Sequence, residues 1–214
     1  DRSTYKLLGG SIGFYGSTLN TRQYATKGYL EKLIAQVFTG RERFEPGNPQ
    51  EGYSPSPQER QSWLQISYMK EAYHTMGPKF TLGWMAEALY SSKNFSENYT
   101  ATMMQAGEFA PTPHSKLMYN EAFRANQYVA AGIKPIYVLN DMFQFRTEFY
   151  GFTPIFPIKK NALNKAYYGK AFSRFEYMGE VSVICHLPFG AISAYVNHYS
   201  SPRREWNVGM TIGW

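Results

Sequence analysis

The sequence W-N-V-G-M-T-I-G-W, residues 206–214, alternates strictly between two kinds of side chain. Because successive side chains of a β-strand point to opposite faces, this pattern predicts a strand with one apolar face and one small or polar face. Such a strand suits a wall between lipid and a polar lumen, and the residues expected on its lipid side are Trp206, Val208, Met210, Ile212 and Trp214. The last strand of a soluble β-sandwich alternates in the same way, so the rest of the chain must decide.

The composition favours a membrane barrel over an ordinary soluble domain. Aromatic residues make up 17% of the 214 residues and charged residues only 18%, while the mean hydropathy is negative, at -0.44. These values fit a barrel, because only every second residue of its strands meets lipid. No apolar run approaches the roughly 18 residues of a spanning helix. The start at Asp1 shows no signal peptide, so we interpret the chain as a mature protein or a piece of a longer one.

Nine segments are expected to form strands, and several match the roughly 9–11 residues that cross a bilayer at a tilt. Residues 45–59 contain four prolines and predict a loop, as does the aperiodic segment 91–126. The sequence therefore predicts an all-β fold, an antiparallel transmembrane barrel wall. The expected strands are Tyr5–Ser17, Gly28–Gly40, Gln61–Tyr73, Phe80–Tyr90, Tyr128–Leu139, Met142–Tyr150, Arg174–Cys185, Ala191–Tyr199 and Glu205–Trp214.

Charged residues fall opposite the aromatic face on every strand whose faces can be assigned. The faces of residues 28–40 stay ambiguous, because Leu33 and Ile34 are adjacent. In a sandwich the charged face would meet solvent, whereas in a barrel it lines the lumen. An Arg or Lys turned toward lipid at mid-depth would cost about 2–4 kcal/mol. The residues expected to face the lumen are Glu87, Arg146, Glu148, Arg174, Glu176 and Glu180.

Three segments, in order, resemble the bacterial surface antigen superfamily, which includes the outer-membrane insertase and the two-partner secretion transporters. Residues 19–28, L-N-T-R-Q-Y-A-T-K-G, resemble a turn of that family. Residues 181–199, with L-P-F-G inside them, resemble its penultimate hairpin, and residues 206–209 with the terminal Trp214 resemble its closing strand, which serves as the assembly signal.

The resemblance implies a barrel of roughly sixteen strands. Residues 1–214 would then be the C-terminal part of one barrel domain and hold about the last nine strands. An odd, incomplete set cannot close, and an open sheet edge is not viable in lipid. The missing strands are therefore expected upstream in the parent protein or in another chain.

The aperiodic segment lies where that family's long extracellular loop folds back into the lumen with a V-R-G-F/Y tip. Here the sequence is A-F-R-A-N, residues 122–126, without the glycine, and the acidic residue expected near Tyr150 is missing. Arg124 is the candidate lumen arginine, inserting toward Glu148 or Glu180, or else a solvated loop residue. The departure favours an anchor or exporter, and residues 109–113 and 123–128 look most similar to barrels fused behind patatin-like phospholipase domains.

No catalytic, cofactor-binding or metal-binding residue is predicted in this chain. Residues 9–13 match G-x-S-x-G around Ser11, but they continue as strand, whereas a nucleophile elbow needs a following helix. The histidines are expected at loops or strand faces, because none has metal-ligand spacing: His74, His114, His186 and His198. The single Cys185 excludes an internal disulfide framework.

The net charge of +6 comes without a concentrated basic stripe or a reader motif, so no nucleic-acid partner is predicted. Basic loops near anionic lipid head groups are the alternative. The expected partners are outer-membrane lipids, the outer-membrane assembly machinery, the missing strands and a membrane-protein complex.

Together these inferences predict a barrel in the outer membrane of a Gram-negative bacterium. It would anchor an upstream patatin-like lipolytic domain, or give that domain export or passage, with the chemistry outside this chain. One alternative is a barrel for protein insertion or translocation, and another is a stand-alone porin or adhesin, which needs an even strand count. The last alternative is a soluble all-β binding module.

Overall fold

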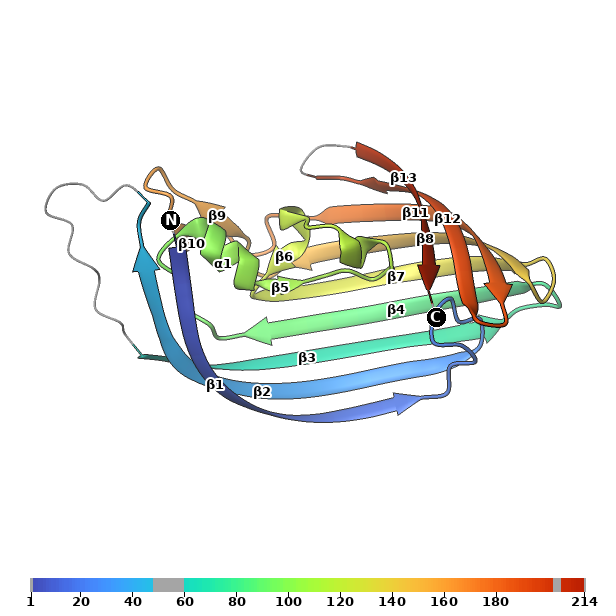
Figure 1. Ribbon diagram of the computed structural model, residues 1–214, viewed down its shortest axis with the longest axis horizontal. Helices are drawn as coiled ribbons and strands as arrows, with labels where there is room; N and C mark the ends of the chain where they lie inside the picture. The colour runs from blue at the N-terminus through green and yellow to red at the C-terminus, as the bar shows by residue number, and fades with distance from the viewer. Residues whose placement is uncertain (1, 48–59, 202–204, 214) are drawn as a thin grey trace, which may run out of the picture.

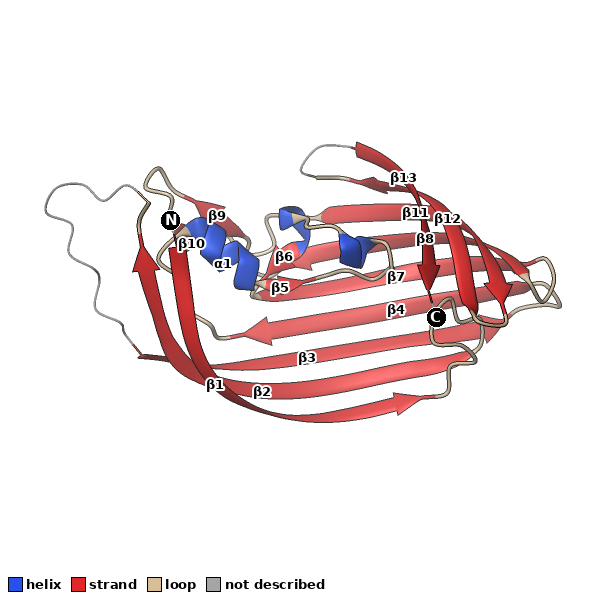
Figure 2. Cartoon of the chain, in the orientation of Figure 1, coloured by secondary structure: helices blue, strands red, loops and turns tan. Residues whose placement is uncertain are grey.

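In the computed structural model, which describes residues 2–47, 60–201 and 205–213, the chain is all-β (Figures 1 and 2). One nine-stranded antiparallel sheet holds the strands in sequence order, each paired with the next. Most of the loop expected at 45–59, together with Trp214, lies outside the described residues. The strands of this sheet are β1 (Arg2–Ser17), β2 (Gly28–Glu45), β3 (Arg60–Thr75), β4 (Phe80–Ser91), β7 (Gln127–Val138), β8 (Phe143–Pro154), β11 (Glu176–Leu187), β12 (Gly190–Tyr199) and β13 (Glu205–Gly213).

The all-β class, the antiparallel order and the nine strands of the main sheet are confirmed, with different strand ends, and the structure adds short elements in the connections that the sequence did not predict. β2 runs on to Glu45 because it stays paired with β1, where Glu45 faces Arg2. β8 runs past Tyr150 to Pro154, because Phe152 continues the inward alternation into a buried cluster. Strand alternation therefore fixed the elements, and pairing between neighbours set their ends.

The sheet is strongly curved, and the chain between β4 and β7 lies within its concave side (Figure 1). We call residues 92–126 the inserted segment. A second excursion, between β8 and β11, forms the ribbon of β9 (Ile158–Lys160) and β10 (Ala166–Tyr168). The inserted segment is built from short elements, namely α1 (Tyr99–Gln105), β5 (Gly107–Glu108), the 3-10 turns η1 (Ser115–Leu117) and η2 (Glu121–Phe123), and β6 (Arg124–Ala125).

The main buried cluster lies between the inserted segment and the concave face of the sheet. Phe109 stacks on Phe152 of β8 with ring centroids 5.9 Å apart, and Phe123 meets Tyr199 of β12 edge to face at 5.7 Å. Tyr128 of β7 completes the aromatic contacts, 5.0 Å from Phe152. These contacts define the concave side as the inner face and its opposite as the outer face.

The connections differ in length between the two ends of the sheet. At one end they are residues 46–59, 92–126, 155–175 and 200–204, and we call this end the long-loop rim. At the other end they are residues 18–27, 76–79, 139–142 and 188–189, which form the short-turn rim. No helix among the described residues is long and apolar enough to cross a membrane.

The turn at residues 18–27 has a sequence-encoded geometry. The Asn20 side-chain oxygen accepts hydrogen bonds from the backbone nitrogens of Thr26 and Lys27, at 2.9 and 3.0 Å. β2 then begins at Gly28 with φ +88°, where a Cβ would lie 2.1 Å from the Thr18 carbonyl oxygen. Only glycine fits that position, and the turn can therefore fold back toward the inner face.

Candidate functional site

A sheet that meets water on one side exposes its polar face and buries its apolar face. In this sheet the apolar face is the exposed one, and the charged face is buried. β8 exposes Phe145 and Phe149 on its outer face and buries Arg146 and Glu148 on its inner face. On β13 the four described residues predicted to face lipid are 67 to 78% exposed: Trp206, Val208, Met210 and Ile212. Apolar side chains are therefore exposed where charged side chains are buried.

Charged residues on β2 and β3 mark both ends of the outer apolar face. Toward the short-turn rim, Glu31 of β2 pairs with Lys70 of β3 at 3.5 Å, and toward the long-loop rim Arg41 lies opposite Arg60. The ten residue-to-residue steps from Glu31 to Arg41 span about 33 Å of strand. At a tilt of 35–45° this equals roughly 25 Å, the height of the apolar band on a membrane barrel.

The structure resolves the faces of β2 that the sequence left ambiguous. Leu33 lies opposite Tyr68, and Val37 lies opposite Leu64, all on the outer face. Ile34 is on the inner face. Between the charged levels, the outer residues of β2 are Leu33, Ala35, Val37 and Thr39.

A network of ion pairs lies on the inner face across β3, β7 and β8. Lys134 Nζ lies 2.9 Å from Glu71, and Arg146 Nη2 lies 2.8 Å from Glu148, which also accepts a 2.7 Å hydrogen bond from Tyr150. Arg146 is only 2% exposed. A buried charge is tolerated only when paired and hydrogen-bonded, and these contacts meet that condition.

The other residues expected to face the lumen lie on the same side. Glu87 of β4 accepts a 2.5 Å hydrogen bond from Tyr128, and Glu176 of β11 pairs with Arg174 at 2.7 Å. Arg174 itself precedes β11 and is partly exposed. Glu180 is buried near the middle of β11 and contacts the inserted segment.

A buried polar cluster fastens the inserted segment to the wall. His114 Nδ1 lies 2.7 Å from Glu180 Oε1, and Thr112 Oγ1 donates to Glu180 Oε2 at 3.1 Å. His114 Nε2 lies 3.0 Å from Ser193 Oγ, and Tyr195 stacks on the imidazole with ring centroids 3.6 Å apart. We call Thr112, His114, Glu180 and Ser193 the latch.

The turn at residues 18–27 reaches the latch from the short-turn rim. The Tyr24 hydroxyl lies 2.8 Å from Ser193 Oγ and 3.2 Å from His114 Nε2. Gln144 donates to the Tyr24 carbonyl at 3.1 Å, and Arg146 donates to the Ala25 carbonyl at 2.9 Å. Two segments that enter from opposite rims therefore meet on the inner face.

Carboxylate, imidazole and hydroxyl follow one another in the latch as in a hydrolytic triad. Ser193 is only 1% exposed, however, and its hydroxyl is shared with Tyr24 and with Thr211, which lies 2.7 Å away. A nucleophile needs room for a substrate beside it, and this hydroxyl has none. The arrangement fixes the inserted segment in place.

His114 lies in a loop, as expected from the sequence, but the sequence did not predict that it is fully buried in the latch. Sequence reasoning missed the latch because its members are distant in the chain. A local signal was present in T-P-H-S, residues 112–115, where Thr112 N donates to Ser115 Oγ at 3.0 Å and Ser115 N to Thr112 Oγ1 at 3.1 Å. This reciprocal turn presents the imidazole.

The expected insertion of Arg124 toward Glu148 or Glu180 is wrong. Arg124 pairs instead with Glu108, its neighbour across the β5–β6 ribbon, at 2.7 Å. The physical reason is that both carboxylates have other partners, since Glu148 pairs with Arg146 and Glu180 pairs with His114. Arg124 also donates to backbone carbonyls of residues 103, 104 and 106, so it holds the inserted segment together internally.

A cation marks the long-loop rim of the inner face. Lys93, just beyond β4, lies over the rings of Trp63 at 5.0 Å and Tyr5 at 5.6 Å. Burial lowers the pKa of Lys93 to about 8, and the Glu42 carboxylate opposes part of that shift.

Neither a nucleophile elbow at Ser11 nor a metal-binding cluster is found among the described residues. Ser11 lies within β1 opposite Gln36, and strand continues on both sides of it, without a helix. In the part of the chain that the structure describes, no group of three or more histidine, cysteine, aspartate or glutamate side chains is arranged to hold a metal ion.

The chain was compared with protein-family models, curated proteins and solved structures. No protein-family model matches the chain, and neither the curated proteins nor the solved structures gave a match.

Proposed function

We propose that this chain forms part of a transmembrane β-barrel in a bacterial outer membrane. The observation that carries the proposal is the inversion of the two faces. A sheet in water buries its apolar face, because apolar surface left in water costs about 25 cal/mol per Å². Here the apolar outer face is the exposed one, and acyl chains are the solvent that suits it. The band of roughly 25 Å between charged levels supports the same conclusion.

The barrel's role is proposed to be anchorage of an upstream domain. Two segments fill the inner face and meet at the latch, which suits an anchor better than an open porin. Transport of a polypeptide past this wall would require the inserted segment to leave contacts that bury Phe109, Phe123 and His114. The resemblance to the surface antigen superfamily suggests a patatin-like lipolytic domain upstream.

Closure of the barrel requires more strands than the described sheet contains. β1 and β13 stand at the two ends of its strand order. Because an unpaired strand edge is costly in lipid, we propose that upstream strands of the parent protein, or another chain, pair with these two strands.

Tryptophan quenching by brominated phosphatidylcholine tests the membrane assignment. Trp84 is on the outer face of β4, whereas Trp63 is on the inner face, 8% exposed and stacked on Phe38. Variants that keep one of these two, with the other tryptophans of the chain changed to phenylalanine, form a matched pair. Strong quenching of Trp84 with little quenching of Trp63 is expected. Equal, weak quenching of both in folded protein would contradict the proposal.

A further inference from the structure

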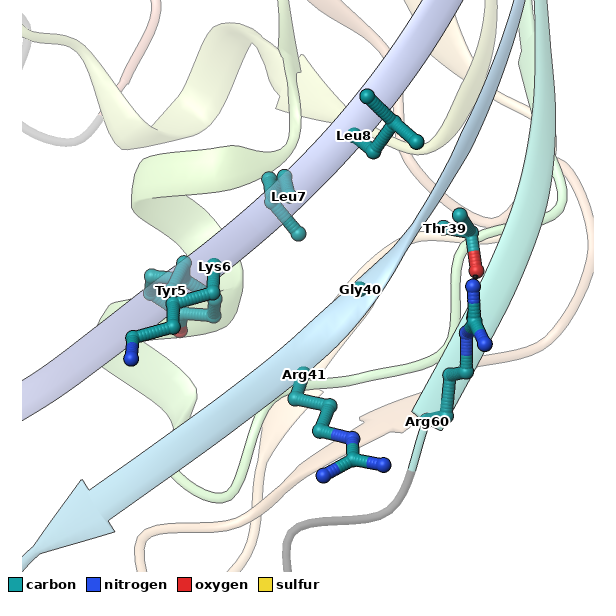
Figure 3. A pocket seen from close by; sticks show the side chains of 8 residues that line it. All are labelled: Tyr5, Lys6, Leu7, Leu8, Thr39, Gly40, Arg41 and Arg60. Carbon is teal, nitrogen blue, oxygen red and sulfur yellow. Dashed lines mark hydrogen bonds between the residues drawn. The ribbon is translucent and has the colours of Figure 1, made fainter.

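Three cations form a row across the first three strands. Lys6 lies opposite Arg41, and Arg41 lies opposite Arg60 in the β2–β3 register. Residues paired in this way share a face, and neighbouring strands are about 4.8 Å apart. Figure 3 shows the three side chains coming from adjacent strands at the long-loop rim. We call these residues the basic row.

Among the residues that the structure describes, the basic row has no acidic partner. Arg60 Nε donates to Thr39 Oγ1 at 3.0 Å, while neither Lys6 nor Arg41 has an ion-pair partner among the described residues. The nearby Arg43 is paired with Glu45 at 2.9 Å, so it differs from the row. Like charges placed directly across strands repel one another, so an anion bound between them would stabilise this arrangement.

A shallow, wide-open depression adjoins the row and is lined by residues from both faces of β1 and β2. Its volume is about 690 Å³, and no acidic side chain is among the described residues that line it, which are Tyr5, Lys6, Leu7, Leu8, Thr39, Gly40, Arg41 and Arg60 (Figure 3). Below the row, the next outward positions are Leu8, Thr39 and Ser62, and Val37 and Leu64 follow one outward position further along β2 and β3. Leu8, Val37 and Leu64 are exposed. Cations at the rim, with exposed aliphatic side chains further along the same face, match the two ends of a lipid.

We propose that the basic row binds the phosphate of a phosphorylated membrane lipid whose acyl chains lie against Leu8, Val37 and Leu64. Arginine suits this ligand because its planar guanidinium matches phosphate oxygens in pairs. The row is at the long-loop rim, and longer loops face the exterior in outer-membrane barrels, so the lipid belongs to the outer leaflet. This inference rests on the proposed membrane location.

An upstream strand beside β1 would not displace the ligand. The backbone alternation of β1 sets which face Lys6 occupies, and pairing along the strand edge leaves that face unchanged. The site is therefore complete within β1, β2 and β3.

Spin-labelled lipids test the proposal. The full-length protein is reconstituted in phosphatidylcholine vesicles with a trace of spin-labelled phosphatidylglycerol or, separately, spin-labelled phosphatidylcholine. Electron paramagnetic resonance then measures the motionally restricted fraction of each label. The wild type is expected to prefer phosphatidylglycerol by about fivefold or more, the size of one cation–lipid contact at a membrane surface.

Two triple variants remove the same charge from different places. K6Q/R41Q/R60Q is expected to abolish the preference. K159Q/K160Q/K170Q removes three exposed lysines at the same rim and is expected to retain it. Circular dichroism and the heat-dependent gel mobility of both variants establish that each is folded.

The outcomes separate the two proposals. Two results would overturn the basic row as a phosphate site. One is motionally restricted lipid in the wild type with no preference for phosphatidylglycerol, and the other is an equal loss of that preference in both triple variants. Displacement of the lipid by inorganic phosphate or an oligonucleotide at equal ionic strength would overturn the lipid as its ligand. Absence of restricted lipid of either kind would overturn the membrane location itself.

Discussion

The outer and inner faces of β8 and β11 differ although the same strands form both. Phe145 and Val181 are exposed on the outer face, whereas their neighbours Arg146 and Glu180 are buried on the inner face. The inner face finds its partners within the chain, in the inserted segment and the turn at residues 18–27. The outer face finds none among the described residues. Under our proposal the outer face has an external partner, and lipid fits its chemistry.

The largest expected effect concerns the inner face. Arg146→Met leaves Glu148 buried without its cation and should destabilise the protein by about 3–5 kcal/mol. Because two well-packed apolar residues can replace a buried pair, adding Glu148→Met should recover part of this loss. Urea unfolding in lipid vesicles measures both. A double variant no more stable than the single one would show that the pair does not act as a unit.

The matching change on the outer face is Val181→Arg. Val181 is 54% exposed, and a surface substitution in a soluble protein usually changes stability by less than about 0.5 kcal/mol. At mid-depth in a bilayer an arginine should cost about 2–4 kcal/mol. Urea unfolding in lipid vesicles measures the loss of stability. Thr39→Arg, near the charged level, is the control and is expected to cost less. A negligible effect of Val181→Arg would contradict lipid contact.

The latch joins the inner face to the inserted segment. His114→Ala removes the contacts to Glu180 and Ser193 and leaves both buried groups with fewer partners, at a cost of about 1–3 kcal/mol. The loss should be local, so trypsin cleavage after Lys116 should accelerate by about fivefold or more. His74→Ala, at an exposed site, is the control. Unchanged cleavage of the latch variant would refute the fastening role.

The smallest expected effect is a pH dependence from Lys93. Its pKa of about 8 is below the ordinary lysine value of 10.5, so the unfolded state binds more protons between these values. The free energy of unfolding should therefore rise with pH from about 8 to 10.5 by this contribution. The difference between the wild type and Lys93→Met, measured across that range, should follow the rise. A flat difference would mean that burial does not shift this group.

Strand content was predictable from the sequence because period-two alternation is local. The twelve residues from Arg174 to Cys185 gave the two faces of β11, and the structure has the same faces. The path of the inserted segment was not predictable, since its contacts join residues far apart. Arg124 illustrates the difficulty: its partner Glu108 lies across a ribbon of two-residue strands, too short for any periodic signal.

The latch shows the same limit for the candidate site. His114 contacts Ser193 and Tyr24, which are 79 and 90 positions away in the chain. The T-P-H-S turn indicated a local geometry but not what it would meet. Such a cluster depends on the curvature of the whole sheet and on two segments entering from opposite rims.

The most direct test of lipid contact is a nitroxide scan of β11, residues 177–184, in reconstituted protein with Cys185→Ser. Collision rates with oxygen and with a water-soluble nickel chelate report apolar and aqueous surroundings. We expect the outer positions Tyr177, Gly179, Val181 and Val183 to favour oxygen over nickel, and the inner positions between them to exclude both. Nickel access at the outer positions equal to that at the exposed Ser173 would contradict the account.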